Sequence, residues 1–142
     1  TIMAFKFRDG VVLAADGRTS SGSFVASRCS DKLTEIAPNI YCCRSGSAAD
    51  TQIITRKVGR EIKLLSRKEE TVPSVSKAAC LVKNIIYAHE QLLAGIIVAG
   101  YDTAPRVYSI KVCGTLIEQE LALGGSGSAY IYGFCDTHFK AG

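Results

Sequence analysis

Short apolar segments separated by turn-forming residues dominate the first third of the chain. Their length and partial alternation predict strands over residues 1–7, 11–16, 24–29, 31–36 and 40–44. Asp9 and Gly10 tolerate the backbone of a tight turn between the first two, and residues 17–23 predict a polar loop. Similar apolar segments return later and predict strands over residues 94–102, 106–112 and 115–123.

Between these two groups of strands the apolar spacing changes to that of a helix. A stripe spaced by four, four and three residues predicts a helix from residue 48 to about residue 66, and it consists of Ile54, Val58, Ile62 and Leu65. Ser47 and Asp50 resemble a capping box at the start of this helix, because a hydroxyl three residues before a carboxylate can satisfy free backbone N–H groups.

A second helix is predicted to open at Pro73 and Ser74. Its apolar stripe consists of Val75, Ala78, Val82, Ile85, His89 and Leu92. We expect His89 to be a half-buried packing residue, and we expect residues 129–139 to begin a third helix. Strands, two helices, strands and a helix in this order predict an α+β fold, in which two antiparallel sheets have helices packed outside them.

Length, composition and charge fit one globular domain over residues 1–142. The net charge of +4 arises from 17 Lys and Arg residues against 13 Asp and Glu residues, and it is not clustered. The most charged stretch, residues 56–70, mixes both signs, so we expect a solvated helix face and no nucleic-acid partner. No segment has the pattern of a membrane span or a signal peptide.

The six cysteines lack the spacing of a metal site, because none forms a C-x-x-C pair and neither histidine lies at ligand spacing from one. We expect no metal or organic cofactor, and we expect reduced, mostly buried thiols. Cys42 and Cys43 directly precede Arg44, whereas a phosphatase-type loop needs its cysteine several residues before the arginine. We therefore assign both cysteines to packing.

Two other segments could carry chemistry. The Gly-Ser turn over residues 124–128 could hold a phosphate at a helix start, but it lacks the lysine of a P-loop and could equally be a plain helix cap. Thr1 carries a hydroxyl beside an α-amine that could accept the hydroxyl proton without a histidine. Such a site also needs a cation, a carboxylate and oxyanion donors; otherwise Thr1 is simply the first ordered residue.

The segment TIMAFKFRDGVVLAADGRTSSGSFVASRCSDKLTEI, followed by IYCCRSGSAADTQ, resembles the catalytic beta subunits of the proteasome core particle, which are N-terminal-nucleophile hydrolases. AGIIVAGYD and GGSGSAYIYG extend the resemblance over essentially the whole chain. IYCCRSGSAADTQ is most similar to the caspase-like subunit, which cuts after acidic residues. The resemblance implies a four-layer αββα sandwich, stacked seven-membered rings of alpha and beta subunits as partners, unfolded polypeptides as substrates, and a cytoplasmic and nuclear location.

The resemblance also implies catalytic roles for four residues. Asp16 matches the buried aspartate of the family and Lys32 its catalytic lysine, whose positive charge would favour loss of the hydroxyl proton. Gly46 matches the glycine whose backbone N–H forms the oxyanion hole, and it stands between a predicted strand and a helix start. Ser126 matches the serine that hydrogen-bonds the terminal amine and a catalytic water.

A second group of residues matches the substrate pocket. Arg44 matches the residue at the floor of the specificity pocket, where a guanidinium can bind a substrate carboxylate through two hydrogen bonds. Without the resemblance, Arg44 would be a surface arginine at a strand end. Ser20 matches the position whose backbone pairs with the extended substrate. The other pocket positions are small or polar: Ser30, Thr34, Ala48 and Gln52.

Two departures from the family pattern bear on the site. Alignment on Asp16 and Lys32 makes Thr1 match the second of the two threonines that begin these subunits. We therefore expect the nucleophile to be Thr1 or a threonine directly before it, because a shift of one residue reverses the face of a strand side chain. The family fold also continues past the last residue here, so its C-terminal part is expected to be missing.

These inferences favour a threonine-type endopeptidase that cuts polypeptides after acidic residues. Two rivals from other classes remain. One is a structural, non-catalytic subunit of the same rings, which the position of Thr1 keeps open. The other is a phosphate- or nucleotide-binding module built on residues 124–128.

Overall fold

The computed structural model describes residues 1–140 as ten strands and three helices. The strands are β1 (Ile2–Phe7), β2 (Gly10–Ala15), β3 (Thr19–Ser21), β4 (Phe24–Ser27), β5 (Leu33–Ala37), β6 (Ile40–Gly46), β7 (Ala94–Tyr101), β8 (Pro105–Ile110), β9 (Leu116–Glu118) and β10 (Leu121–Gly124). The helices are α1 (Ala48–Glu69), α2 (Val75–Ala88) and α3 (Ser128–His138).

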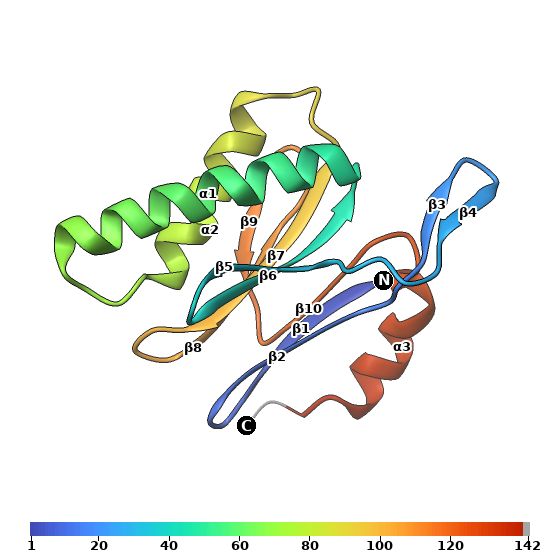
Figure 1. Cartoon of the computed structure of the whole chain (residues 1–142). Helices are drawn as coiled ribbons and strands as arrows, with labels where there is room; N and C mark the ends of the chain where they lie inside the picture. The colour runs from blue at the N-terminus through green and yellow to red at the C-terminus, as the bar shows by residue number, and fades with distance from the viewer. Residues whose placement is uncertain (141–142) are drawn as a thin grey trace.

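Eight of these strands form two antiparallel sheets, and the other two form a separate hairpin (Figure 1). The larger sheet has the order β5-β6-β7-β8-β9, and the smaller has the order β10-β1-β2. In the smaller sheet, Ile2 lies opposite both Ala15 of β2 and Gly124 of β10. This register brings the loop after β2 and the loop after β10 to the same end of the sheet as the N-terminus.

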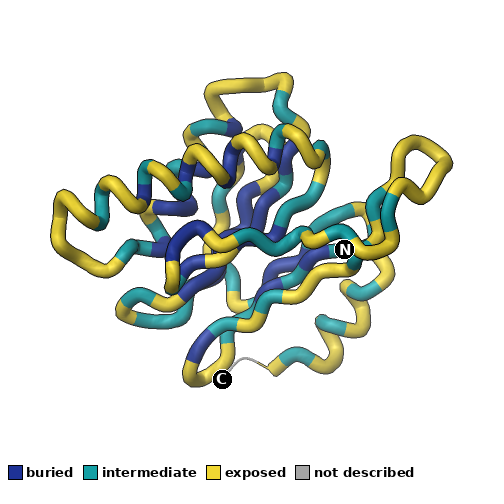
Figure 2. The backbone as a smooth tube through the Cα atoms, viewed as in Figure 1, coloured by how far each residue is buried: buried dark blue, intermediate teal, exposed yellow. Residues whose placement is uncertain are grey.

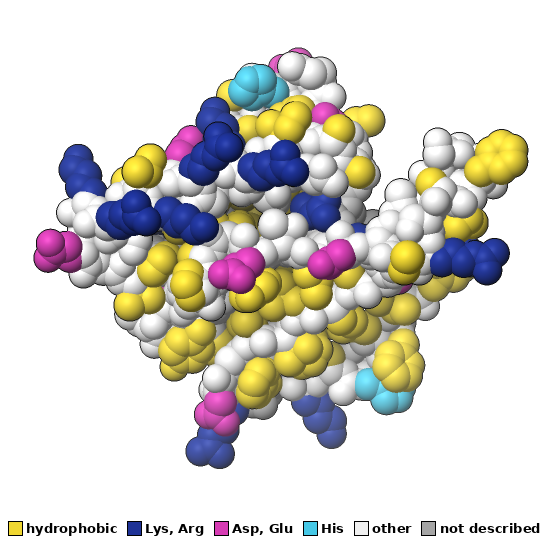
Figure 3. Space-filling view, viewed as in Figure 1, with side chains coloured by type: hydrophobic (Ala, Val, Ile, Leu, Met, Phe, Trp, Pro, Cys, Tyr) yellow, Lys and Arg dark blue, Asp and Glu magenta, His cyan; other side chains and the backbone are white. Residues whose placement is uncertain are grey.

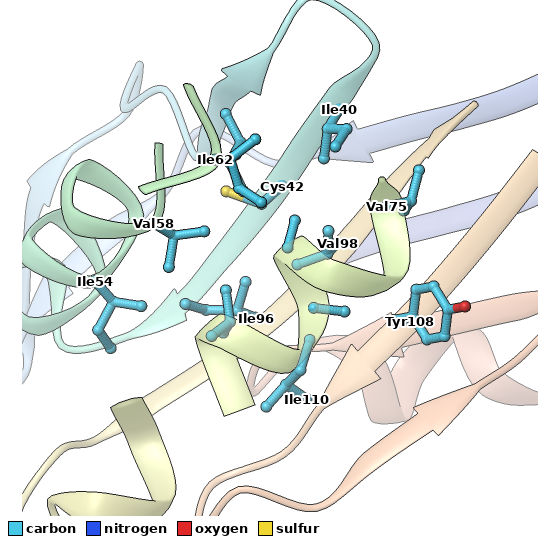
Figure 4. Close-up of a cluster of buried hydrophobic side chains, with 14 of the residues drawn as sticks. Ile40, Cys42, Ile54, Val58, Ile62, Val75, Ile96, Val98, Tyr108 and Ile110 are labelled. Atoms are coloured by element: carbon cyan, nitrogen blue, oxygen red, sulfur yellow. The ribbon is translucent and has the colours of Figure 1, made fainter. Parts of the chain in front are cut away.

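Helices α1 and α2 cover one face of the larger sheet, and the main core lies between these two helices and the sheet (Figures 1 and 4). The apolar stripe from which α1 was predicted contributes three fully buried side chains to this core, Ile54, Val58 and Ile62. They pack against sheet residues such as Cys42, Ile96, Val98 and Ile110. Each buried side chain of this size stabilises the fold by about 1.5–3 kcal/mol. The exposed segments lie outside this interface, along the outer face of α1 and in the loops (Figure 2).

A second, smaller core fills the space between the two sheets. It contains Ile2, Ala4, Cys43, Ile97, Ala99, Val107 and Ala122. Cys42 faces the helices and its neighbour Cys43 faces the other sheet, because successive side chains of a strand point to opposite faces. Strand β6 is thus buried on both faces, and the packing roles predicted for the two cysteines are confirmed.

The third helix lies on the other side of the smaller sheet, away from α1 and α2 (Figure 1). Phe5 of β1 contacts Phe139, directly after α3, with ring centroids 5.9 Å apart. None of the α3 side chains is buried. The order of layers is helices, sheet, sheet and helix, which confirms the predicted αββα sandwich of antiparallel sheets.

Two strand predictions were wrong in detail. The segment 115–123, predicted as one strand, forms β9 in the larger sheet and β10 in the smaller sheet. Where the segment passes from one sheet to the other, the ammonium group of Lys6 in β1 donates to Glu118 at 3.3 Å and to Glu120 at 3.0 Å. The segment 17–23 was predicted as a loop but contains β3, which pairs with β4. The local pattern of residues could not show this pairing.

Two side-chain predictions were also wrong. His89 is exposed, because α2 ends at Ala88 and the His89 ring turns back to the carbonyl oxygen of Ile85, 2.9 Å from Nδ1. The expectation of mostly buried thiols fails as well: only Cys42 and Cys43 are buried, and the others are exposed or half-buried.

The Lys and Arg side chains of the charged stretch 56–70 gather on the exposed side of α1 (Figure 3), while Val58 and Ile62 of the same stretch face the core. This placement confirms the prediction of a solvated helix face. None of the helices in residues 1–140 combines the length and the apolar character needed to cross a membrane.

Candidate active site

A cavity of about 770 Å³ opens where the N-terminus meets the ends of both sheets. Its walls come from segments far apart in the sequence: the start of β1, the loop after β2, β3, the loop before β5, the end of β6, the start of α1 and the turn after β10. Ten of the eleven predicted site residues line it, namely Thr1, Asp16, Ser20, Ser30, Lys32, Arg44, Gly46, Ala48, Gln52 and Ser126. The exception is Thr34, which contacts Arg44 instead.

A charged cluster forms around Asp16 at one side of this cavity. Lys32 Nζ donates to Asp16 Oδ1 at 2.9 Å, and the amine of Thr1 donates to the same oxygen. The backbone N–H of Arg18 donates to Oδ2 at 2.9 Å. Asp16 is exposed here, whereas the resemblance implied a buried aspartate. Desolvation still raises the pKa of its carboxyl, but these three donors outweigh it and hold the pKa well below its ordinary value. Asp16 is therefore a carboxylate that anchors two cations.

Gly46 ends β6 in a conformation that requires glycine. Its φ is +96°, and a Cβ there would lie 2.2 Å from the carbonyl oxygen of Leu93. Backbone N–H groups alternate in direction along a strand, and that of Arg44 donates to the carbonyl of Lys32 at 2.9 Å, on the β5 side. The N–H of Gly46 therefore points to the same side but lies beyond the first residue of β5, so it faces the cavity.

Arg44 is held by two acceptors, the side-chain hydroxyl of Thr34 and the backbone carbonyl of Asp31. Its Nε donates to Thr34 Oγ1 at 2.9 Å, and its Nη2 donates to the carbonyl oxygen of Asp31 at 2.7 Å. A guanidinium carries five N–H donors, so three remain for a ligand in the cavity. Their geometry suits a carboxylate, which can accept two parallel hydrogen bonds from one arginine.

The turn after β10 lies against Thr1. A Cβ on Gly127 would stand 2.3 Å from Thr1 Oγ1, and one on Gly125 would stand 3.4 Å from the Thr1 nitrogen. A larger residue at position 127 would therefore displace Thr1, whereas Gly125 is favoured by its φ of +82°. Ser126, between them, lines the cavity. The hydrogen bond to the terminal amine that the resemblance implied for Ser126 is not formed within residues 1–140, where the Thr1 amine donates to Asp16.

Neither buried cysteine can act as a nucleophile at this site. Burial raises the pKa of Cys42 to about 12 and that of Cys43 to about 12, so both remain thiols near neutral pH. Within residues 1–140, no three His, Cys, Asp or Glu side chains are grouped so as to hold a metal ion. The polar chemistry of the cavity thus rests on Thr1, Asp16, Lys32 and Arg44.

Sequence reasoning missed several residues that shape the site. Asp31 contributes a backbone carbonyl to Arg44, and Arg18 contributes a backbone N–H to Asp16. Backbone contacts leave no trace in residue type, so no pattern could have shown them. Asp50 was assigned to a capping box, yet its carboxylate accepts from the N–H of Leu93 at 3.2 Å.

Two sheets between helices, with an amine, an ion-paired lysine and a strand-end glycine at one cavity, fit the N-terminal-nucleophile hydrolase class. The Proteasome family model, described as proteasome subunit, matches residues 1–142. The chain therefore belongs to the proteasome subunit family, and the resemblance to its beta subunits is confirmed by the named relatives that follow.

The chain is 51% identical over 142 residues to "Probable proteasome subunit beta type-1" of Encephalitozoon cuniculi, covering 100% of this chain and 70% of that protein. It is 50% identical over 143 residues to the protein of the same name from Schizosaccharomyces pombe, covering 99% and 63%. It is 46% identical over 143 residues to "Proteasome subunit beta type-1" of Saccharomyces cerevisiae, covering 99% and 66%. The chain thus spans 63% to 70% of the length of these relatives.

Proposed function

We propose that this chain carries the active site of a threonine-type endopeptidase of the proteasome core particle, which cuts unfolded polypeptides after acidic residues. Its partners would be other alpha and beta subunits in stacked seven-membered rings, in the cytoplasm and nucleus. One observation carries the proposal: Thr1, the Asp16–Lys32 ion pair and the Gly46 N–H share one cavity with Arg44.

The proposed reaction is acyl transfer. A threonine hydroxyl attacks the scissile carbonyl, and its proton passes to the terminal amine or to Lys32. Lys32 can accept the proton only as a neutral amine; as the ammonium that is ion-paired with Asp16, it instead favours formation of the alkoxide, and Asp16 compensates its charge. When the C–N bond breaks, the leaving amine takes up the proton and an ester joins the substrate to the threonine. Water then attacks the ester and releases the acid, which regenerates the hydroxyl.

The negative charge that develops on the carbonyl oxygen would be stabilised by the backbone N–H of Gly46. The tetrahedral intermediate carries a negative oxygen, and the N–H of Gly46 would donate to it. Gly46 directly precedes the N-terminus of α1, where the helix dipole also favours negative charge. Ser126 would orient the hydrolytic water together with the terminal amine, since its side chain lines the cavity.

Arg44 supports the proposed preference for acidic residues. Two fixed contacts orient its guanidinium, and its remaining donors could bind the carboxylate of a substrate Asp or Glu. Ser30, Ala48 and Gln52 line the same cavity and leave space for such a side chain. Ser20, on β3, would pair through its backbone with the extended substrate.

The position of the Thr1 hydroxyl favours a second candidate function, that of a structural, non-catalytic subunit of the same rings. Thr1 Oγ1 lies beside Gly127, and Lys32 Nζ donates to Asp16, with no Thr1–Lys32 hydrogen bond among the described residues. The Thr1 amine, by contrast, shares Asp16 Oδ1 with Lys32. We propose that the nucleophile is Thr1 or a threonine directly before it.

Peptide cleavage by assembled particles tests the proposal. We expect Lys32→Ala in the full-length subunit to abolish hydrolysis of peptides with Glu at the cleavage site, whereas Lys63→Ala, on the exposed face of α1, should leave it unchanged. Arg44→Gln should selectively reduce cleavage after Glu. Unchanged cleavage in Lys32→Ala would remove the lysine from the chemistry, and unchanged preference in Arg44→Gln would remove the arginine from the pocket.

Covalent labelling separates the enzyme from the structural subunit. A peptide inhibitor that esterifies a catalytic hydroxyl should modify one threonine, and fragmentation of the labelled N-terminal peptide should place the adduct on Thr1 or directly before it. Failure of the native particle to label this subunit, while its other subunits react, would favour the structural role.

A further inference from the structure

A ring of three hydrogen bonds joins the start of α1 to the loop before β7. The Asp50 carboxylate accepts from the N–H of Leu93 at 3.2 Å, and the carbonyl of Leu93 accepts from the N–H of Ser47 at 2.7 Å. Ser47 Oγ accepts from the N–H of Asp50 at 3.3 Å, which closes the ring. The predicted N-cap at Ser47 is confirmed by this contact, but the carboxylate serves Leu93 and not the N–H of Ser47.

This ring acts directly on the backbone of Gly46. The Leu93 carbonyl packs against the Gly46 Cα so closely that a Cβ would stand 2.2 Å from its oxygen. The same carbonyl holds the next N–H in the chain, that of Ser47. The peptide between Gly46 and Ser47 is therefore held on one side of the Gly46 Cα. The N–H of Gly46 belongs to the preceding peptide, between Ser45 and Gly46, and the Gly46 φ of +96° sets how the two peptides are oriented relative to each other.

Leu93 has few other anchors. Its side chain is 62% exposed, so packing contributes little to its position, and it lies outside β7. Its backbone N–H and C=O hold it, and Asp50 is the acceptor for the N–H. The Asp50 carboxylate oxygen is the side-chain acceptor for this N–H, and it restrains the peptide between Leu92 and Leu93.

We propose that Asp50 is a positioning residue for the oxyanion donor at Gly46, acting through the backbone of Leu93. Asp50 does not line the cavity and would not touch substrate. By holding the Gly46 Cα and the peptide after it, this link would limit rotation about the Gly46 N–Cα bond, and so the direction of the N–H in the preceding peptide. The effect of Asp50 on catalysis rests on the proposed peptidase function. The link from Asp50 through Leu93 to Gly46 is structural and does not depend on activity.

The ordinary role of an acidic residue in the first turn of a helix is different. There a carboxylate stabilises the helix through its negative charge near the positive end of the dipole. Two variants separate the roles. Asp50→Asn keeps an oxygen acceptor at the same distance but loses the charge. Asp50→Glu keeps the charge, is a residue common at this helix position, and moves the acceptor by one methylene.

The test uses the full-length subunit in assembled particles. For peptides with Glu at the cleavage site, we expect Asp50→Glu to lower kcat about tenfold with little change in KM, since loss of a whole oxyanion donor costs about 100- to 1,000-fold. The affinity of a peptide aldehyde, whose tetrahedral adduct bears the oxyanion, should fall by the same factor. Asp50→Asn should stay close to wild type in both measurements. The reverse order, with Asn impaired and Glu active, would overturn the proposal.

Hydrogen exchange provides a readout that does not depend on cleavage. In Asp50→Glu the amides of Ser47 and Leu93 should exchange faster than in wild type, while in Asp50→Asn they should stay protected. Equal protection in both variants would overturn the link between Asp50 and Gly46. If wild-type particles cleaved no acidic peptide through this subunit, the proposed function would fail, and exchange alone would still decide the positioning role.

Discussion

Replacement of Thr34 by valine tests how the pocket orients Arg44. Valine has nearly the shape of threonine but cannot accept the hydrogen bond that Arg44 Nε now donates at 2.9 Å. The contact of Nη2 with the Asp31 carbonyl would remain, so the guanidinium would keep one of its two anchors. It could then rotate about that anchor and present its free donors in more than one direction.

The magnitude follows from the type of bond that is lost. A hydrogen bond to a charged group contributes about 1.5–3 kcal/mol. Arg44 and Thr34 are both half-buried, so water can replace part of the loss, and the lower end applies. Since about 1.4 kcal/mol corresponds to a factor of ten, we expect kcat/KM for cleavage after Glu to fall about tenfold.

The assay compares two fluorogenic peptides that differ only in Glu or Leu at the cleavage site, with particles containing the full-length subunit. Thr34→Val should reduce cleavage after Glu and leave cleavage after Leu unchanged or increased. Thr34→Ser keeps the hydroxyl and serves as the matched control, so it should resemble wild type. An unchanged Glu-to-Leu ratio in Thr34→Val would refute the idea that this hydroxyl orients Arg44.

Three further predictions concern stability of the full-length subunit. Gly46→Ala should lower the unfolding free energy by about 1–3 kcal/mol in thermal unfolding, because the new Cβ would stand 2.2 Å from the Leu93 carbonyl oxygen at a residue with positive φ. Gly133→Ala is the control, because a Cβ there would meet no atom within 4 Å. Asp16→Asn should destabilise the fold near neutral pH. The depressed pKa of Asp16 contributes stability above its ordinary value of 3.8 and loses it as pH falls toward the folded-state value, so urea midpoints of variant and wild type should converge from about pH 5 to about pH 2. Ile54→Ala should cost about 2–5 kcal/mol because the side chain is 1% exposed, whereas its neighbour Ile53, at 66% exposure, should tolerate alanine; equal losses at both would contradict the assigned packing.

The sequence by itself determined the local elements and most of the site residues. Helix α1 follows from the spacing of Ile54, Val58 and Ile62, because one apolar face of that period can be buried only as a helix. The resemblance to proteasome beta subunits then selected Asp16, Lys32 and the other candidates, ten of which line one cavity. Motif positions carry this information because each role demands a particular residue type at a particular place in the chain.

Only the tertiary structure decided which segments meet. The division of residues 115–123 between two sheets depends on partners in β8 and β1, which no local pattern contains. One of the two anchors of Arg44, the Asp31 carbonyl, and the contact of Asp50 with the N–H of Leu93 involve backbone groups, which residue type does not reveal. The residue type at each position therefore predicts the chemistry that its side chain offers. Long-range packing decides which partner each group meets and in which direction it points.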